Sequence, residues 1–198
     1  MTAEEKKSVA FFIDIASDRA RGGYCRGERE YCFSDDYDSL VVGPKGAAAP
    51  PVMVIGDVSD SGEDAILLDK MLASINLSRE SNCFIANIVK CRPPDNRDPQ
   101  PDEIAACAGF LESQMQSLKP RFILCVGRLS AQAMLHSAEP IGKLRGRFMD
   151  CKAAGMTIPL IATYHPSALL RNEEYKRPAW DDLKLLRAAL GSVESGAK

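Results

Sequence analysis

The sequence predicts an α/β protein built around a mostly parallel sheet. Two observations predict this fold class and its organisation as one domain. First, four short apolar runs alternate along the chain with stretches whose apolar residues recur at helical spacing, which is typical of βαβ units. Second, 198 residues with 45% hydrophobic composition are enough for one domain with a substantial core. We therefore expect a single domain over residues 1–198, with a polar, cysteine-bearing arm at 1–45 and an α/β core at 46–198.

The apolar runs are the expected strands, because each is short, rich in Val, Ile, Leu or Phe, and bounded by turn residues. The expected strands are 51–56 (PVMVIG), 83–90 (CFIANIVK), 121–127 (RFILCVG) and 157–164 (TIPLIATY). Each is followed by a helical pattern, and the expected helices are 63–77, 101–118, 128–136 and 177–190. Pro101 suits the first turn of the second helix. Ser61 followed by Asp64 could cap the first helix reciprocally.

Charge and composition exclude some classes of function. The formal net charge is -2, so the chain has no overall basic field, and contact with nucleic acid would have to come from a local patch. No apolar run is long enough to span a membrane. The first 18 residues lack the pattern of a secretory signal. We expect a cytoplasmic protein without membrane contact, and a monomer.

The turn after the first expected strand, in VIGDVSDSGED, joins a glycine to a run of acidic residues. A strand, a glycine turn and a helix start often form an anion site, because free N–H groups point out of the helix. The acidic residues of this turn would repel a phosphate; they are Asp57, Asp60, Glu63 and Asp64. In parallel sheets ligands bind at the carboxyl ends of the strands. The expected site region therefore includes this turn, together with 87–97, 127–128 and 164–167.

Two polar residues in that region are candidates for chemistry. His165 could stabilise a developing negative charge or move a proton, or it could only hydrogen-bond within its turn. Asn87 lies in an apolar strand and could read the edge of a base, or it could be a structural amide. His136 is expected at the surface, at a helix C-terminus. Arg145 and Arg147 could contact phosphates or lie in a solvated turn.

Seven cysteines are many for a cytosolic chain of this size, where disulfides are rare. Cys83 and Cys125 lie in apolar runs and are expected in the core, whereas Cys151 gives no indication. Four thiolates are the number that an iron–sulfur cluster or a structural zinc takes. Such a set could come from Cys25, Cys32, Cys91 and Cys107. The alternative is that Cys91 and Cys107 are unrelated and that the arm carries free thiols.

Several segments together resemble one family. They are NIVKCRPPDNRDPQPDEIAAC, KPRFILCVG, IGKLRGR, IPLIATYHPSALLR and AWDDL. The sequence is similar to the family 4 uracil-DNA glycosylases of bacteria and archaea over roughly residues 52–190. The combination of KCRPP-x-NR-x-P with a downstream HPS is specific.

The resemblance implies an α/β fold that is a three-layer α/β/α sandwich around a mostly parallel four-stranded sheet. It implies a base-excision repair enzyme that flips uracil from DNA and hydrolyses its N-glycosidic bond. By the resemblance Asp57, Asn87 and His165 are catalytic. The residues implied at the base and the DNA are Gly56, Pro166, Ser167 and Arg171. The implied cofactor is an iron–sulfur cluster of the 4Fe-4S type, with Cys25, Cys32, Cys91 and Cys107 as its ligands.

Two features depart from the family. Its N-terminal ligands form a close C-x-x-C pair, whereas Cys25 and Cys32 are spaced more widely. The first motif is also altered: Asp57 stands on the family's glutamate, and the family's loop of about ten residues, which carries a base-stacking phenylalanine, is missing. Stacking on a base contributes about 1–3 kcal/mol. A carboxylate displaced by about 1 Å can lose roughly a hundredfold in rate.

Three hypotheses follow. The first is an active glycosylase, slow or with an altered base preference, because Asn87 and His165 are present. The second is a catalytically impaired DNA-binding or damage-sensing module on the same fold, because the first motif is altered. The third is a scaffold for a protein partner, with the acidic turn as an interaction patch.

Overall fold

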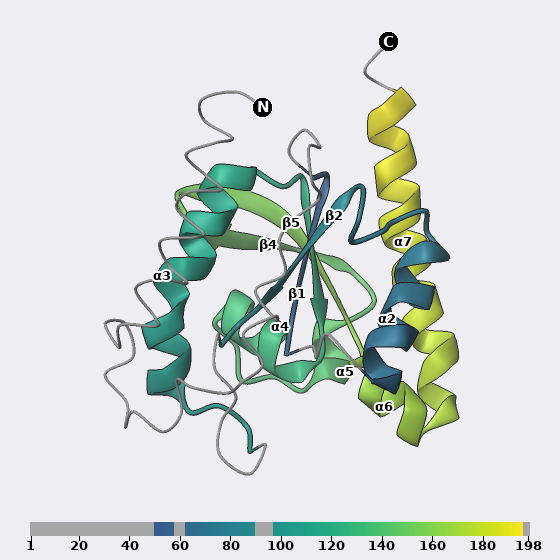
Figure 1. The fold of residues 1–198 in the computed structure, drawn as a ribbon, viewed down its shortest axis with the longest axis horizontal. Helices are drawn as coiled ribbons and strands as arrows, with labels where there is room; N and C mark the ends of the chain where they lie inside the picture. Colours follow the sequence, from purple (N-terminus) through teal and green to yellow (C-terminus); the bar gives the residue numbers. More distant parts are fainter. Residues whose placement is uncertain (1–49, 58–61, 90–96, 196–198) are drawn as a thin grey trace.

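The computed structural model describes residues 50–57, 62–89 and 97–195. The expected arm at 1–45 lies outside these residues. Five strands form one sheet in the order β2-β1-β3-β5-β4. The strands are β1 (Val52–Gly56), β2 (Cys83–Asn87), β3 (Phe122–Val126), β4 (Phe148–Ala153) and β5 (Met156–Thr163). The four expected strands pair in parallel, which confirms the predicted fold class (Figure 1).

The expectation of four strands is wrong by one. β4 pairs antiparallel with β5 through a tight turn in which Ala154 and Gly155 both have positive φ, 55° and 73°. Two consecutive residues with positive φ are typical of a two-residue hairpin turn. The sequence did not indicate β4, because among its six residues only Cys151 is buried and no apolar run marks an edge strand.

The expected helices are present, with some changes at their ends. The structure contains α2 (Glu63–Ala73), α3 (Pro101–Leu118), α4 (Arg128–Leu135), α5 (Ile141–Leu144), α6 (Pro166–Arg171), the 3-10 turn η4 (Glu173–Tyr175) and α7 (Lys176–Ser195). α2 ends before the expected Leu77, because Asn76 adopts positive φ, yet Ile75 and Leu77 remain buried. Its N-cap is Gly62, which makes no side-chain cap, and Ser61 of the expected Ser61–Asp64 cap lies outside the described residues.

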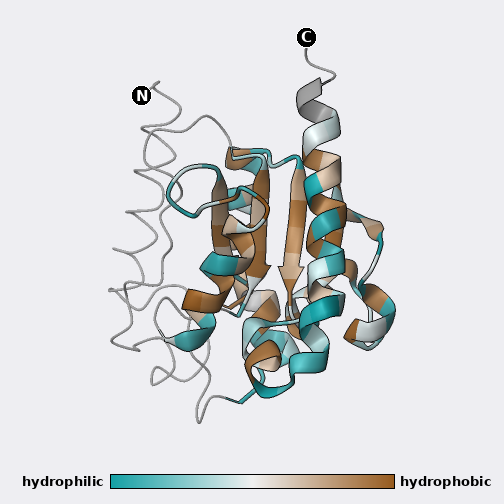
Figure 2. Ribbon diagram, turned by 90° about the vertical axis from the view of Figure 1, so that its right-hand side faces the viewer, coloured by the Kyte–Doolittle hydropathy of each residue, from teal (hydrophilic) through white to brown (hydrophobic). Residues whose placement is uncertain are grey.

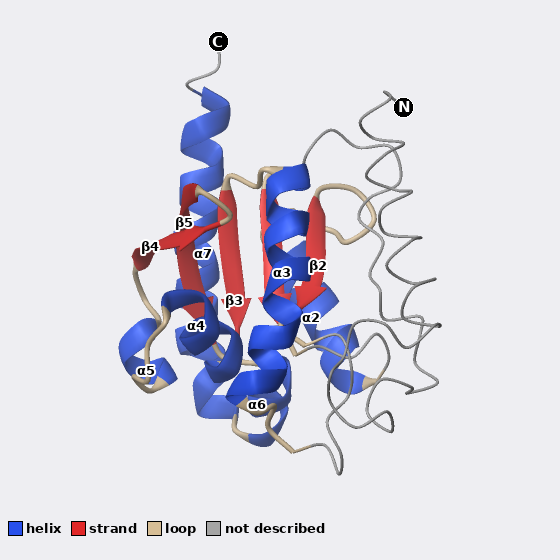
Figure 3. Ribbon diagram, turned by 90° about the vertical axis from the view of Figure 1, so that its left-hand side faces the viewer, coloured by secondary structure: helices blue, strands red, loops and turns tan. Residues whose placement is uncertain are grey.

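The sheet is covered on both faces, which makes the three-layer sandwich. α2, α6 and α7 pack on the face that carries Val52 and Val54 of β1. α3, α4 and α5 pack on the opposite face, with Met53 and Ile55. All five residues of β1 are buried, as expected for a central parallel strand. Figure 3 shows α3 and α4 over one face, and Figure 2 shows α7 beside the apolar strands from the other.

None of the helices in the described part of the chain is long and apolar enough to cross a bilayer. The parallel strands have their carboxyl ends at one edge of the sheet, and the residues after these ends are the ones that position the candidate site.

Candidate active site

The carboxyl ends of β1, β2, β3 and β5 bring three predicted residues to one edge of the sheet. Asp57 follows β1 and is exposed, whereas Asn87 ends β2 and is half-buried. His165 follows β5 and is also half-buried. Because ligand sites lie at the strand ends of parallel sheets, this edge is the candidate site.

His165 bridges β5 and β1. Its Nε2 lies 3.1 Å from the backbone carbonyl oxygen of Asp57, 108 residues away in the chain. Its Nδ1 lies 2.7 Å from Ser167 Oγ and 3.2 Å from the Ser167 backbone nitrogen. The Ser167 N–H can only donate, so Nδ1 must accept. The Asp57 carbonyl can only accept, so Nε2 must carry the hydrogen.

The protonation state of His165 follows from its surroundings. Burial lowers the pKa of the imidazole below 6.5, and nearby Arg171 acts in the same direction. The carbonyl of Asp57 and the carboxylates of Asp57 and Asp64 oppose this effect without overcoming it. At neutral pH His165 is therefore an uncharged ring whose N–H donor is directed at the end of β1.

Gly127, between β3 and α4, allows His165 to lie where it does. It has φ of 101°, and a Cβ atom placed on it would be 3.1 Å from His165 Cβ. Its N–H donates to the carbonyl of Thr163, the last residue of β5, at 2.9 Å. Only glycine combines this backbone conformation with so close a neighbour. Gly127 was included in the site region expected from the sequence, but no role was predicted for it. The pattern that could have indicated one is a glycine directly between an expected strand and an expected helix.

Gly56 and Asn87 are neighbours across the sheet. They are paired in register at the ends of β1 and β2, and the Ile88 N–H donates to the Gly56 carbonyl at 3.0 Å. Gly56 is buried and Asn87 is half-buried, so Asn87 ends β2 directly beside the residue that precedes Asp57. β1 ends at Gly56 and α2 begins at Glu63, which leaves a short connection.

The three other residues expected at the DNA lie on α6. Pro166 is buried at the first position of the helix, where a missing N–H costs nothing. Ser167 is half-buried and is engaged with His165. Arg171 is exposed at the end of the helix. α6 thus carries one residue that orients His165 and one exposed cation.

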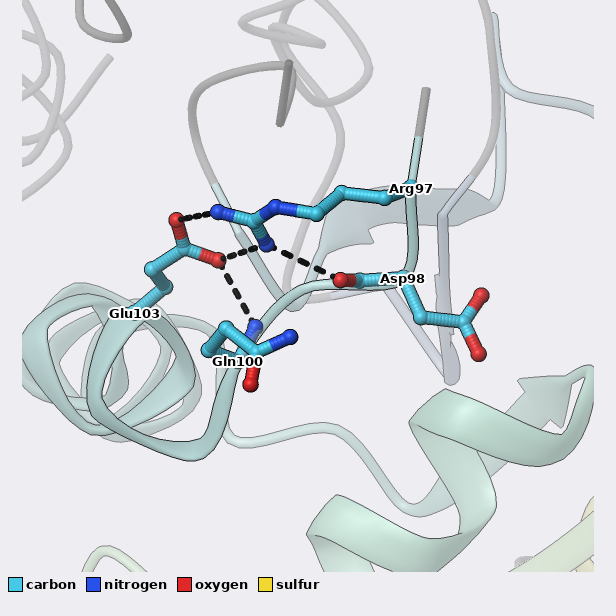
Figure 4. A network of polar contacts seen from close by, with 4 residues as sticks. All are labelled: Arg97, Asp98, Gln100 and Glu103. Carbon is cyan, nitrogen blue, oxygen red and sulfur yellow. Dashed lines mark hydrogen bonds and ion pairs between the residues drawn. The ribbon is translucent and has the colours of Figure 1, made fainter. Parts of the chain in front are cut away.

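A polar network fixes the chain where it enters α3 (Figure 4). Arg97 donates to both carboxylate oxygens of Glu103, at 2.7 and 2.8 Å, and to the carbonyl of Asp98 at 3.0 Å. Glu103 also accepts from the Gln100 N–H at 2.7 Å, which completes a capping box. The Arg97 side chain and backbone hydrogen bonding lower the pKa of Glu103 to about 2. The basic residue Arg97 therefore has a structural partner in this network.

Arg145 is not placed to contact phosphates, which corrects that alternative. Its guanidinium forms a two-pronged ion pair with the buried Asp182 of α7, at 2.9 Å for each contact. Arg147, two residues further on, is exposed. His136 is exposed at the C-cap of α4, as expected.

The cysteines separate into two groups. Cys83, Cys125 and Cys151 are buried in the two core clusters, and burial raises the pKa of each thiol. Cys107 is buried on α3 but belongs to neither cluster. The other three expected ligands lie outside the described residues; they are Cys25, Cys32 and Cys91. Within residues 50–57, 62–89 and 97–195, no group of three or more metal-binding side chains gathers.

The fold and this edge define a class: an α/β/α sandwich whose site is built from the carboxyl ends of parallel strands around a neutral histidine. The family model of the uracil DNA glycosylase superfamily matches residues 58–184, which is more than half of the chain. The chain belongs to the uracil DNA glycosylase superfamily.

Within this superfamily, the chain is similar to several type-4 uracil-DNA glycosylases. A type-4 uracil-DNA glycosylase from Saccharolobus solfataricus is 37% identical over 195 residues, 91% of this chain and 87% of that protein. One from Archaeoglobus fulgidus is 36% identical, with 65% of this chain and 66% of that protein covered. One from Pyrobaculum aerophilum is 33% identical over 78% of this chain and 85% of that protein. The resemblance expected from the motifs is confirmed.

Proposed function

We propose that the protein is a type-4 uracil-DNA glycosylase of DNA repair. It flips a deaminated base from DNA and hydrolyses the N-glycosidic bond of that base, and its main substrate is uracil. The observation that carries the proposal is His165, a neutral imidazole whose Nε2–H is directed at the end of β1. A donor at this edge suits a leaving group that departs with negative charge on a carbonyl oxygen.

His165 stabilises the departing base. When the bond between the sugar C1′ and uracil N1 breaks, the electron pair leaves with uracil, and the charge spreads to its O2. The Nε2–H of His165 donates to that oxygen. Ser167 holds Nδ1 as the acceptor, which keeps the hydrogen on Nε2. Since the ring is neutral, it acts as a hydrogen-bond donor and transfers no proton in this step.

Asp57 and Asn87 supply the other two parts of the reaction. The carboxylate of Asp57 accepts a proton from a water molecule as the water oxygen bonds to C1′. The amide of Asn87, beside Gly56, donates to and accepts from the edge of the flipped base, and this selects uracil. Gly56, Pro166, Ser167 and Arg171 form the surrounding base and DNA contacts.

The connection between β1 and α2 limits the rate of base release. It is short, and Asp57 is one methylene shorter than the glutamate of the family. In the free protein the Asp57 carbonyl also accepts from His165 Nε2, so substrate must displace that contact. These features favour a slow enzyme. They equally suit a catalytically impaired module that binds damaged DNA, which is the second candidate function.

The two candidates differ in base release and in the requirement for Asp57. Oligonucleotides carrying uracil, hypoxanthine or thymine in one position, single-stranded or paired, would be incubated with excess wild-type enzyme and with Asp57→Asn. The glycosylase proposal expects uracil release by wild type that falls about a hundredfold in Asp57→Asn at unchanged DNA affinity. DNA binding without release of any base by either protein would favour the second candidate.

We also propose that a 4Fe-4S cluster binds Cys25, Cys32, Cys91 and Cys107. Thiolates are the ligands that such clusters take, and Cys107 is buried on α3, the helix that follows the Cys91 loop in the sequence. The cluster would tie the arm to α3 and would play no chemical part in base release. Protein purified without oxygen should be brown and contain iron; colourless protein with zinc or without metal would contradict the proposal.

A further inference from the structure

Two of the sequence segments that mark this chain, KLRG and DDL, have no part in the proposed chemistry, yet they bind each other. Arg145 donates from Nε to Asp182 Oδ2 and from Nη2 to Asp182 Oδ1, each at 2.9 Å. The carboxylate is fully buried, and only 18% of the arginine side chain is exposed. Nη2 also donates to the carbonyl of Pro178, which attaches the guanidinium to the first turns of α7.

The same guanidinium lies against an aromatic ring at the end of β5. The Arg145 guanidinium carbon is 5.3 Å from the centre of the Tyr164 ring. On its side, Tyr164 stacks with Tyr175 of η4, with 4.4 Å between ring centres and 11° between the planes. The Arg145 backbone forms a bridge with Ala162 of β5. The side chain and the backbone of Arg145 therefore both contact the end of β5.

Tyr164 is the residue that immediately precedes His165. A continuous set of contacts thus runs from the buried carboxylate of Asp182 through Arg145 to Tyr164, and by one peptide bond to His165. We propose that Arg145 is a positioning residue for His165: paired with Asp182, it holds the Tyr164 ring, which also stacks on Tyr175, and so sets the direction of the imidazole.

This inference rests on the proposed function for its catalytic readout but not for its structural one. A purely stabilising pair would change the fraction of folded protein and leave the folded site as it was. A positioning pair changes the imidazole and the chemical step in protein that is fully folded. Imidazole NMR signals can distinguish the stabilising role from the positioning role. The chain has only two histidines, and His136 is exposed at a helix end, so the His165 signals can be told apart from those of His136.

The experiment uses two pairs of variants. Arg145→Met removes the guanidinium, and Lys152→Met is its control, because Lys152 is an exposed cation of β4 paired with Thr157 at the end of β5 away from the candidate site. Arg145→Met also leaves a buried carboxylate without its cation. Tyr175→Leu therefore removes the other contact of the Tyr164 ring, the stack with Tyr175, while the ion pair stays intact, and Tyr175→Phe is its control because it keeps the stacked ring. Each protein is measured below its unfolding temperature, by single-turnover uracil release, by affinity for uracil-containing DNA, and by nitrogen NMR of the imidazoles.

We expect Arg145→Met and Tyr175→Leu to release uracil about 10- to 100-fold more slowly at nearly unchanged DNA affinity. Their His165 spectrum should move away from the wild-type pattern with hydrogen on Nε2, and both controls should match wild type. Wild-type imidazole signals and rates in folded Tyr175→Leu and Arg145→Met would overturn the proposal. If wild type releases no base, the proposed function fails, and the imidazole spectra alone decide the positioning role.

Discussion

A methyl group added at Gly127 should disturb His165 without touching DNA. Gly127→Ala places a Cβ atom 3.1 Å from His165 Cβ, whereas ordinary contacts of this kind begin at 3.4 Å. The histidine must therefore move by a few tenths of an ångström. Because a displacement of about 1 Å can cost roughly a hundredfold in rate, we expect uracil release to slow about three- to tenfold.

The same substitution also strains the backbone. The φ of 101° and ψ of 169° at Gly127 lie in a region that only glycine occupies readily, so alanine there costs about 1–3 kcal/mol. For a chain of this size that corresponds to a loss of roughly 2–12 °C in Tm. Rate and stability must therefore be measured separately.

The assay is single-turnover uracil release by Gly127→Ala at a temperature where it is fully folded, with a thermal melt beside it. Gly109→Ala is the matched control: Gly109 lies within α3, and a Cβ atom there meets nothing within 4 Å. This control should leave the rate unchanged and raise Tm slightly. A Gly127→Ala protein with a lower Tm but the wild-type rate would refute the link between the glycine and the position of His165.

Three other changes give separate outcomes. The pKa of Glu103 in the fold is about 2, so its carboxylate stabilises the fold above pH 4.5, and this contribution is lost as the pH falls toward 2. Glu103→Gln should therefore unfold more easily than wild type by about 1 kcal/mol at neutral pH, and the difference should vanish at low pH in an acid titration of folding. A difference that stays constant with pH would contradict this prediction. Arg145→Met should cost about 3–5 kcal/mol and lower Tm by roughly 10 °C, because Asp182 stays buried; a change of only 1 °C would show that the carboxylate finds other partners. Cys107→Ser should lose iron and Cys151→Ala should keep it, as measured by metal content; equal iron in both would argue against Cys107 as a ligand.

The pH dependence of the site has a definite sign. The pKa of His165 is lower in the fold than the ordinary 6.5, so the unfolded chain binds a proton at a higher pH than the native protein does. The native state is therefore favoured above pH 6.5, and this contribution falls as the pH drops below that value. The neutral donor required for leaving-group stabilisation is present throughout the neutral range, which an NMR titration of the two imidazoles can check.

The sequence predicted most of the fold because its central elements carry strong periodic signals. β1, β2, β3 and β5 are apolar runs with turn residues at both ends, and α3 was predicted with its bounds correct. β4 gave no such signal, since Cys151 is the one buried residue among its six and the strand is held by its pairing with β5. Local patterns do not reveal a strand whose stability comes from its partner.

The candidate site was predictable in position and less so in detail. The strand-end rule located Asp57, Asn87 and His165 at one edge, because the ends of parallel strands always meet there. The tautomer of His165 depends on a contact across 108 residues, and no local pattern carries it. The pairing of Arg145 with Asp182 across 37 residues was hidden for the same reason.

The most direct test is whether base release depends on His165. Uracil release from single- and double-stranded oligonucleotides would be measured under single-turnover conditions for wild type, His165→Gln and His136→Gln. We expect wild type and His136→Gln to release uracil at the same rate, and His165→Gln to be about 100- to 1,000-fold slower while still binding the DNA. Release by His165→Gln at the wild-type rate, or none by wild type at high enzyme concentration despite DNA binding, would contradict the account.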